Sequence, residues 1–167
     1  MDVAGVYLEL YGRIPPLAAQ AVEGLTTDQL THRVTPQANP IGWLVWHMAR
    51  VEDTHIAELL EADQLWARGG WAERFGLAPD PDDNGYGHTP EQVASVRPES
   101  VDVLVEYVGA AHERACRYLV GLQPDDLDRI VDRRWDPPVT MGVRLVSIAD
   151  DCLQHAGQAA YVRGLLG

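Results

Sequence analysis

The chain has 167 residues and carries 25 acidic against 13 basic side chains, which gives a formal charge of −12. This length predicts a single domain over residues 1–167 with a substantial core, and a hydrophobic content of 46% is typical of a globular protein. The excess of acidic side chains repels nucleic-acid phosphates, so we expect no binding to nucleic acid. No apolar run reaches the roughly 18 residues of a membrane-spanning helix, so we expect no membrane partner either.

The first segment has the pattern of an amphipathic helix. Apolar residues recur every three or four positions through residues 3–23, which predicts a helix facing a core. Pro15 and Pro16 should kink this helix or divide it in two. Gly24 follows at the position of a C-terminal cap.

A second helix is predicted to begin at Asn39-Pro40. Asn39 can cap the free N–H groups, and Pro40 suits the first helical position. The helix then extends to about Leu60 or Trp66. The aromatic segment 66–75 is expected to fold over the bundle.

A loop and further helices complete the pattern. Residues 76–90 are rich in proline, glycine and aspartate and therefore predict a loop, and Thr89 begins a capping-box motif that opens a short helix. Long helices are predicted over residues 99–120 and 141–165. Thr140 can cap the last of them.

Four long amphipathic segments without a convincing strand predict an all-α fold, a four-helix bundle with short accessory helices. Only residues 130–139 leave room for a short extended piece. A weak internal repeat relates residues 24–30 to residues 121–127, and further on Gly42 and Gly142 occupy matching places. The repeat suggests two related helical hairpins with the second and fourth helices in equivalent positions.

Histidines and one carboxylate are the candidates for chemistry. The sequence has no glycine-rich phosphate loop, no Cys-x-x-Cys motif and no serine nucleophile elbow. Asp151 and His155 are four residues apart on the last helix, within about 40° around its axis, so their ligand atoms can point to one place. His47 on the opposing helix can supply a third ligand. Such a set suits Zn²⁺, Ni²⁺, Fe²⁺ or Mn²⁺ and leaves places for water or substrate.

Spacing alone leaves other roles open for these residues. An inward histidine is more often a hydrogen-bonded core residue than a ligand, and Asp151 can instead cap a helix or pair with an arginine. His55 and His88 are candidates for a supporting or ligand-binding role, His88 as part of a lid formed by its loop. The alternative for both is a position at the surface.

The remaining histidines and the two cysteines have simpler expectations. His32 and His112 are expected to face solvent, while Cys116 and Cys152 are expected to pack in the core. Two cysteines are too few for a disulfide scaffold, and the N-terminal residues do not resemble a signal peptide, so we expect a cytoplasmic protein.

Two segments resemble the helix signatures of the DinB-like metal-binding four-helix bundles. Residues 39–47 (NPIGWLVWH), followed by residues 51–53 (VED), resemble the second-helix signature. Residues 151–158 (DCLQHAGQ), followed by residues 161–164 (YVRG), resemble the signature of the final helix. The resemblance extends over essentially the whole chain. It implies a divalent transition metal, with zinc as the first candidate, held by His47, Asp151 and His155.

The resemblance also implies a class of activity. Related members are transferases of low-molecular-weight thiols such as bacillithiol or mycothiol, in which a metal-bound thiol attacks a small electrophile. The mycothiol-dependent maleylpyruvate isomerases resemble this pattern with a His–Glu–His site, so Asp151 is one methylene shorter than their glutamate. They also have a C-terminal domain that helps to form the active site. Because the present sequence stops after the last helix, we expect a second subunit to complete the pocket or the chemistry to differ.

Three functions follow from these patterns. The first is a metal-dependent transferase that conjugates a mycothiol-like thiol to a small electrophile, with a metal-dependent hydrolase as a close relative. Gln158 and Arg163 are candidates to orient a ligand or to bind a carboxylate. The second is a non-catalytic metal- or ligand-binding bundle of a stress response. The third is a structural helical dimer whose polar core pairs Asp151 with His47 or His155. We expect a homodimer in each case, since small helical bundles often associate through their helices.

Overall fold

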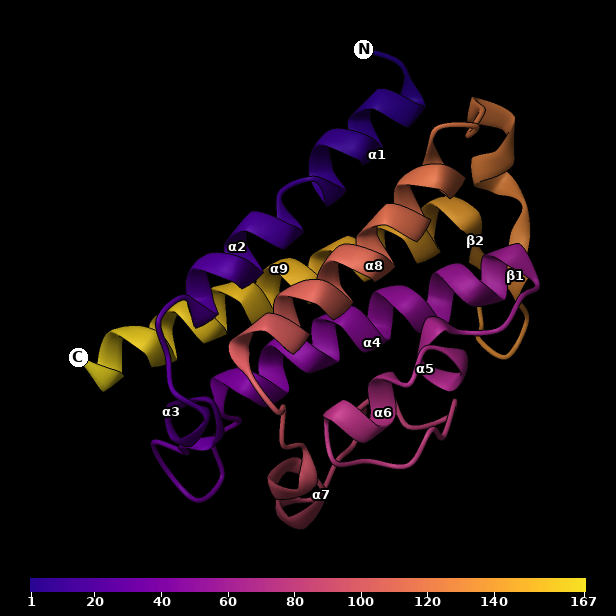
Figure 1. The fold of residues 1–167 in the computed structure, drawn as a ribbon. Coiled ribbons are helices and arrows are strands. Elements are labelled where there is room, and N and C mark those ends of the chain that lie inside the picture. The colour runs from indigo at the N-terminus through magenta and orange to yellow at the C-terminus, as the bar shows by residue number, and fades with distance from the viewer.

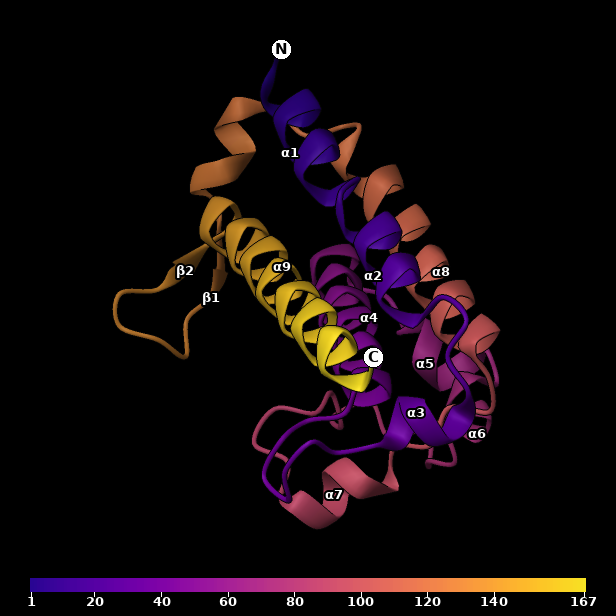
Figure 2. The same cartoon turned by 90° about the vertical axis from the view of Figure 1, so that its left-hand side faces the viewer.

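The computed structural model describes residues 1–167 and consists of long helical segments that pack lengthwise (Figure 1). Helix α4 packs against both α8 and α9, and α2 packs against the other side of the α8–α9 pair (Figure 2). The predicted all-α four-helix bundle is therefore confirmed. The segments of the bundle are α1 (Val3–Tyr11) with α2 (Ile14–Val22), α4 (Ile41–Leu60), α8 (Val101–Leu119) and α9 (Met141–Leu166).

The first bundle segment is divided as its prolines predict. Helix α1 ends before Gly12, and α2 begins anew with Pro15 and Pro16 in its first turn, where a missing N–H group leaves no helical bond unmade. Gly24 adopts a left-handed conformation with φ of 71°, which confirms the predicted cap position. The Tyr11 hydroxyl donates a 2.8 Å hydrogen bond to the Leu145 carbonyl and so fastens α1 to α9.

The start of α4 differs from the prediction by one residue. Pro40 has an extended conformation (φ −73°, ψ 160°) and is itself the N-cap, so helical geometry begins at Ile41, and no side chain caps this end. Asn39 therefore does not cap the helix. The start of α9 is as predicted, because the Thr140 hydroxyl accepts a hydrogen bond from the Val143 amide.

Short helices connect the long segments of the bundle. The capping box at Thr89 opens α7, as predicted, and the aromatic segment after α4 forms two single-turn helices. The polar stretch after Gly24 contains one short helix, α3, that the sequence analysis did not predict; Thr26 and Gln29 form its capping box. The short elements are α3 (Thr27–Thr31), α5 (Leu65–Arg68), α6 (Trp71–Arg74), α7 (Pro90–Ser95) and the 3₁₀ helix η1 (Pro124–Asp128).

A two-stranded antiparallel hairpin, β1 (Ile130–Asp132) and β2 (Val139–Thr140), leads into α9. It lies in the one region where an extended piece was predicted. Residues 76–89 contain no helix or strand, as expected for a loop. No helix combines the length and the hydropathy that crossing a membrane requires.

The internal repeat corresponds to equivalent local packing. Gly42, near the start of α4, lies against Leu30 at the C-terminal half of α3, and a Cβ atom at Gly42 would come within 2.9 Å of the Leu30 carbonyl oxygen. Gly142, near the start of α9, lies in the same way against Leu127 of η1, with a Cβ separation of 3.3 Å. Each glycine thus allows a short helix, α3 or η1, to pack closely against the first turn of a long helix. The starts of α4 and α9 therefore have equivalent neighbours.

Candidate metal centre

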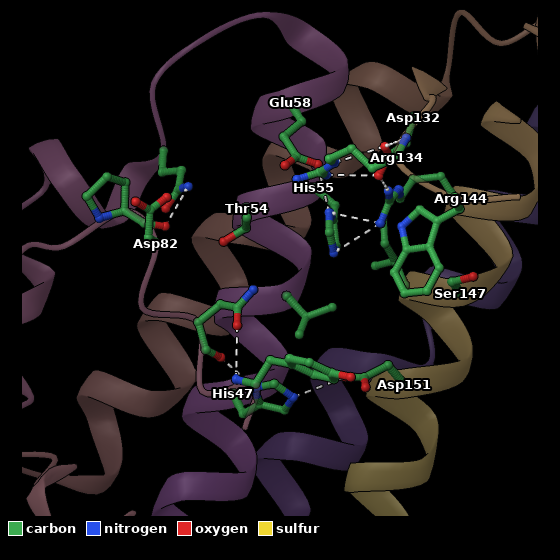
Figure 3. A pocket seen from close by; sticks show the side chains of 17 residues that line it. His47, Thr54, His55, Glu58, Asp82, Asp132, Arg134, Arg144, Ser147 and Asp151 are labelled. Carbon is green, nitrogen blue, oxygen red and sulfur yellow. Dashed lines mark hydrogen bonds and ion pairs between the residues drawn. The ribbon is translucent and has the colours of Figure 1, made fainter. Parts of the chain in front are cut away.

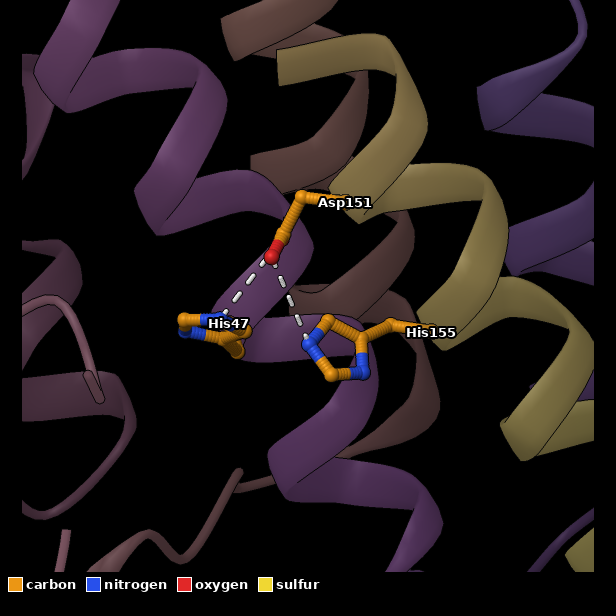
Figure 4. A group of neighbouring side chains, drawn as sticks. All are labelled: His47, Asp151 and His155. Carbon is orange, nitrogen blue, oxygen red and sulfur yellow. Dashed lines mark ion pairs between the residues drawn. The ribbon is translucent and has the colours of Figure 1, made fainter. Parts of the chain in front are cut away.

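Three side chains from α4 and α9 converge on one point near the middle of the bundle (Figure 4). His47 projects from α4, and Asp151 and His155 project from successive turns of α9. One ligand atom from each residue lies within 4.8 Å of those of the other two. The structure therefore brings together the three residues that the sequence predicted as a metal site.

His47 presents its Nε2 atom to the site in a defined tautomer. Its Nδ1–H group donates to the Asn84 carbonyl at 2.5 Å, which leaves the lone pair on Nε2, 3.6 Å from Asp151 Oδ2. The ring is almost fully buried and stacks on Trp43 with 4.8 Å between ring centroids. Burial lowers the pKa of His47, against the opposing effects of the Asn84 carbonyl and Asp151, and so favours the neutral imidazole that metal ions bind.

His155 is oriented in the same manner from the other helix. Its Nδ1 atom lies 2.9 Å from Gln158 Oε1, one turn further along α9, and this bond directs Nε2 to within 3.7 Å of Asp151 Oδ1. Gln158, which was a candidate to orient a ligand, thus contacts the His155 ring. Each histidine has a hydrogen-bond acceptor on Nδ1 and a free Nε2, which is the usual arrangement of metal-ligating histidines.

Asp151 lies between the two imidazoles without bonding to either. Separations of 3.6 and 3.7 Å are too long for hydrogen bonds, and Asp151 Oδ2 is a buried oxygen with no hydrogen-bond partner. Ligand atoms around a tetrahedral zinc ion lie about 3.4 Å apart, close to these separations. The donor set therefore fits a divalent cation better than it fits a hydrogen-bonded core pair.

A cavity of about 680 Å³ opens beside the three residues and runs between α4 and α9 (Figure 3). His47 and Asp151 lie on its wall, whereas His155 does not line it. Most of the residues that line it have polar side chains, and exposed Tyr86 and Trp135 contribute from two different loops. The cavity is lined by His47, Val51, Thr54, His55, Glu58, Gln64, Pro81, Asp82, Asn84, Tyr86, Asp132, Arg134, Trp135, Arg144, Ser147, Ile148 and Asp151.

Charged side chains form the wall of the cavity away from the metal centre. Arg144 donates to Asp132 at 2.8 Å and lies 3.4 Å from the ring nitrogens of His55, which itself pairs with Glu58 at 2.9 Å. The neighbouring Arg134 holds the pKa of Asp132 well below its usual range. His55 therefore lines the cavity two turns from His47 and does not contact the metal centre.

Buried Arg50 fixes the loop that supplies the Asn84 carbonyl. Arg50 has no solvent exposure and donates to the carbonyls of Pro81 and Asp83, to Gln64 and to the Tyr107 hydroxyl. Its positive charge is balanced by Asp53 at 3.5 Å. A guanidinium group with this many acceptors leaves the loop little freedom next to His47.

His88 fixes the other end of this loop. The Trp43 indole N–H donates to His88 Nδ1 at 3.1 Å, so Nε2 carries the proton and donates to Asp83 at 2.6 Å. The His88 side chain is largely buried and does not line the cavity. It is therefore an anchor of the loop, and neither a lid over the pocket nor an exposed side chain.

Three other residues differ from their predicted surroundings, and one of them is Cys116, which is partly exposed although a core position was expected. Arg163 donates to the Ala21 carbonyl at 3.0 Å and so joins the end of α9 to α2; it does not line the cavity. His112 was expected to face solvent, but its ring faces Glu52 at 3.7 Å and Cys116 at 3.3 Å. His32 is exposed and Cys152 is buried, as expected.

Sequence reasoning missed the residues that orient His47. Asn84 acts through its backbone carbonyl, so its side-chain type carries no signal of this role. Gly85 is needed because its φ is 95° and because a Cβ atom there would come within 2.8 Å of His47 Nδ1. Arg50 lies one turn after His47 in a helix that is buried on nearly all sides, where an arginine is unexpected and signals a buried polar network.

The chain is similar to a protein family and to a solved structure. A family model described as mycothiol S-transferase matches residues 17–167. A solved structure of a conserved protein from Enterococcus faecalis is similar over 98% of this chain and 96% of that one, with 32% sequence identity and a TM-score of 0.89. No protein with a curated description matches the chain.

Proposed function

The chain belongs to the mycothiol S-transferase family, and on that basis we propose that it is a metal-dependent transferase that joins a low-molecular-weight thiol to a small electrophile. The family supplies the class of reaction. The observation that carries the metal dependence is the convergence of His47, Asp151 and His155: both histidine Nε2 atoms face the Asp151 carboxylate, whose buried Oδ2 atom has no hydrogen-bond partner.

The proposed chemistry depends on the acidity of the thiol. A divalent ion held by the three residues would bind the thiol sulfur, lower its pKa and so make the thiolate available as a nucleophile at neutral pH. The ligand set of two nitrogens and one oxygen leaves coordination positions free for that sulfur. Zinc is our first candidate, and nickel, iron and manganese accept the same ligands.

The chain's own residues orient the reaction. The Asn84 carbonyl and the Gln158 amide oxygen accept hydrogen bonds from the Nδ1–H groups of His47 and His155. Both N–H groups therefore point away from the centre. The cavity gives thiol and electrophile a common approach along the wall formed by His47 and Asp151. Its size, about 680 Å³, is in the range of small-molecule sites.

The first experiment is elemental analysis of the untagged protein and of His47→Ala. The ion bound at this centre is the one that wild type retains and His47→Ala loses. Wild type loaded with each candidate metal is then mixed with mycothiol, or with a simpler thiol, and an alkylating electrophile, and the thioether product is measured by chromatography. We expect metal-dependent product with wild type and none above the uncatalysed rate with His47→Ala.

The other functions give different results in the same experiment. A metal-loaded wild type that forms no thioether with any thiol would be a non-catalytic binding protein. Turnover of an ester or amide without added thiol would identify a hydrolase. If wild type and His47→Ala contain no transition metal even after incubation with zinc, then the three residues are core polar residues and the proposal is wrong.

A further inference from the structure

The cavity beside the metal centre extends about two helical turns beyond His47 and Asp151. Thr54 follows His47 by seven residues on α4, and Arg144 precedes Asp151 by seven residues on α9. Seven residues are nearly two full turns and rise about 10 Å, so each residue lies on the same face of its helix as the metal ligand. All four line the cavity, and Arg144 contacts His55 at the end away from the metal centre (Figure 3).

The Thr54 hydroxyl lies on the wall of this cavity without a hydrogen-bond partner. The residue is only 8% exposed, and its Oγ1 atom is buried and makes no hydrogen bond. A hydroxyl in a helix often donates to a carbonyl of the preceding turn, as Ser147 does to Val143. A buried hydroxyl that makes no such bond is unfavourable, so its position on the cavity wall points to a ligand that bonds to it.

Arg144 has hydrogen-bonding capacity that the folded chain does not use. Its Nη2 atom donates to Asp132 at 2.8 Å, whereas Nη1 approaches only the ring nitrogens of His55 at 3.4 Å, a long separation for an N–H donor. The side chain is largely buried. Asp132 therefore holds the guanidinium group in place and leaves Nη1 available to a hydroxyl or carbonyl oxygen in the cavity.

The charges of the lining disfavour a ligand that carries anionic groups. Two arginines, Arg134 and Arg144, face four carboxylates, those of Glu58, Asp82, Asp132 and Asp151. Both arginines pair with the same residue, Asp132. A divalent ion at the metal centre would offset the excess of negative charge, and the thiolate sulfur of the substrate would restore part of it. Neutral groups such as hydroxyls and amides therefore suit the rest of the cavity better than further anions.

We propose that Thr54 and Arg144 form the subsite for the body of the thiol, meaning the part of the molecule beyond its sulfur. They select a neutral, hydroxyl-rich thiol whose polar groups lie about 10 Å from the sulfur. The inference rests on the proposed transferase function. A thiol as small as cysteine ends before it reaches this subsite. Glutathione and coenzyme A would bring carboxylates or phosphates into a lining that is already negative.

Fluorescent thioethers test this subsite without turnover and without metal. The bimane conjugates of mycothiol, cysteine and glutathione carry the same fluorophore and differ in the body of the thiol. Each is titrated with the metal-free full chain, and binding is measured by fluorescence anisotropy. The body of mycothiol is a neutral pseudodisaccharide, so we expect its conjugate to bind at least about tenfold more tightly than the other two.

Two variants test the residues of the subsite. Thr54→Val keeps the size of the side chain and removes an unpartnered hydroxyl, so we expect it to fold by circular dichroism and to bind the mycothiol conjugate about fivefold more weakly. Arg144→Lys keeps a positive charge opposite Asp132 but lacks the second donor nitrogen, and we expect a similar loss. Thr31→Val is the matched control on α3, where the hydroxyl donates to the Thr27 carbonyl, and it should bind as wild type does.

Two results would overturn the proposal. One is equal affinity of wild type for the three conjugates, and the other is wild-type affinity of Thr54→Val for the mycothiol conjugate. If wild type nevertheless forms thioether in the activity assay, only the subsite is wrong. Selective binding of the mycothiol conjugate by a wild type that forms no thioether would support the subsite and reject the transferase.

Discussion

Asp151 is the residue at which a metal ligand and a structural core residue differ most clearly. A structural aspartate between two histidines would accept a hydrogen bond from at least one of them. Here both histidines direct their Nδ1–H groups elsewhere, and Asp151 Oδ2 remains buried without a partner. The carboxylate therefore contributes little to the stability of the metal-free protein and is available to a cation.

Substitutions of Asp151 should separate metal binding from folding. We expect Asp151→Asn to lose the ion that His47 helps to bind, while the free energy of unfolding of the metal-free protein changes by less than about 1 kcal/mol. Asp151→Glu should keep the metal, because the longer carboxylate has the same charge. Elemental analysis and urea denaturation measure the two effects, with Asp150→Asn as the exposed control. A loss of about 3 kcal/mol in metal-free Asp151→Asn would instead show a structural pair.

Gln158 should act on the metal through His155. Gln158→Ala removes the acceptor at His155 Nδ1, so the ring is free to rotate and to change tautomer. We expect metal affinity to fall by about 10- to 100-fold, measured by competition with a chromophoric chelator. Gln154→Ala is the matched control, because Gln154 lies one turn earlier on α9 and bonds only to Asp150. Equal affinities in the two variants would contradict this role.

The loop after α6 is the connecting segment that orients the His47 ring on α4. Residues 80–88 have no regular structure, yet Arg50, His88 and Trp43 fix them at several points. The loop supplies one carbonyl to the centre and one wall to the cavity. Its glycine and aspartate content predicts a loop, but it does not predict that the loop folds back onto α4.

Gly85 should be intolerant of a side chain, whereas Gly87 in the same loop should be more tolerant. Both have positive φ, 95° and 73°, so alanine strains the backbone at either position by about 1 kcal/mol. Only at Gly85 would a Cβ atom also clash, within 2.8 Å of His47 Nδ1, while Gly87 has nothing within 4 Å. We therefore expect Gly85→Ala to weaken metal binding and Gly87→Ala to leave it unchanged. Similar metal affinities by chelator competition would show that the loop does not position His47.

Prolines and capping residues in the sequence account for most of the helix ends. The double proline of α2, the capping box of α7 and the Thr140 cap of α9 act within a few residues, so the sequence predicted them. The Asn39 cap was wrong because Pro40 adopts an extended conformation and takes the cap position itself. The equivalent seating of Leu30 on Gly42 and of Leu127 on Gly142 gives the internal repeat a physical basis.

Within the whole bundle, the candidate metal centre connects two helices that are far apart in the sequence. His47 and the Asp151–His155 pair lie on α4 and α9, which pack against each other along the bundle. An ion bound there joins them in the folded state only, so it should stabilise the whole domain. Association of two copies stays a prediction, which sedimentation velocity can test.

Metal should therefore raise the melting temperature through this centre. With zinc at about a thousand times its dissociation constant, the stabilisation is about 4 kcal/mol, or about 10 °C for a domain of this size. We expect His47→Ala to lose most of this increase in differential scanning calorimetry. Equal increases in wild type and His47→Ala would place the stabilising ion elsewhere.

The amino-acid sequence was sufficient to predict the helical fold, the positions of most helix ends and, together with the family resemblance, the three residues of the candidate metal centre. Those features depend on periodicity, caps and a spacing of four residues along one helix, all of which are local. His47 could be added to Asp151 and His155 because the amphipathic pattern of α4 and α9 turns both helices to a common core.

The groups that surround that centre could be identified only from the folded structure. A backbone carbonyl from a distant loop orients His47, and a buried arginine holds that loop; neither leaves a local pattern in the sequence. The same holds for Thr54 and Arg144, which come from two helices and line one cavity only because α4 packs on α9. Contacts between distant segments depend on how the helices are rotated and aligned, and packing of the complete core sets that geometry.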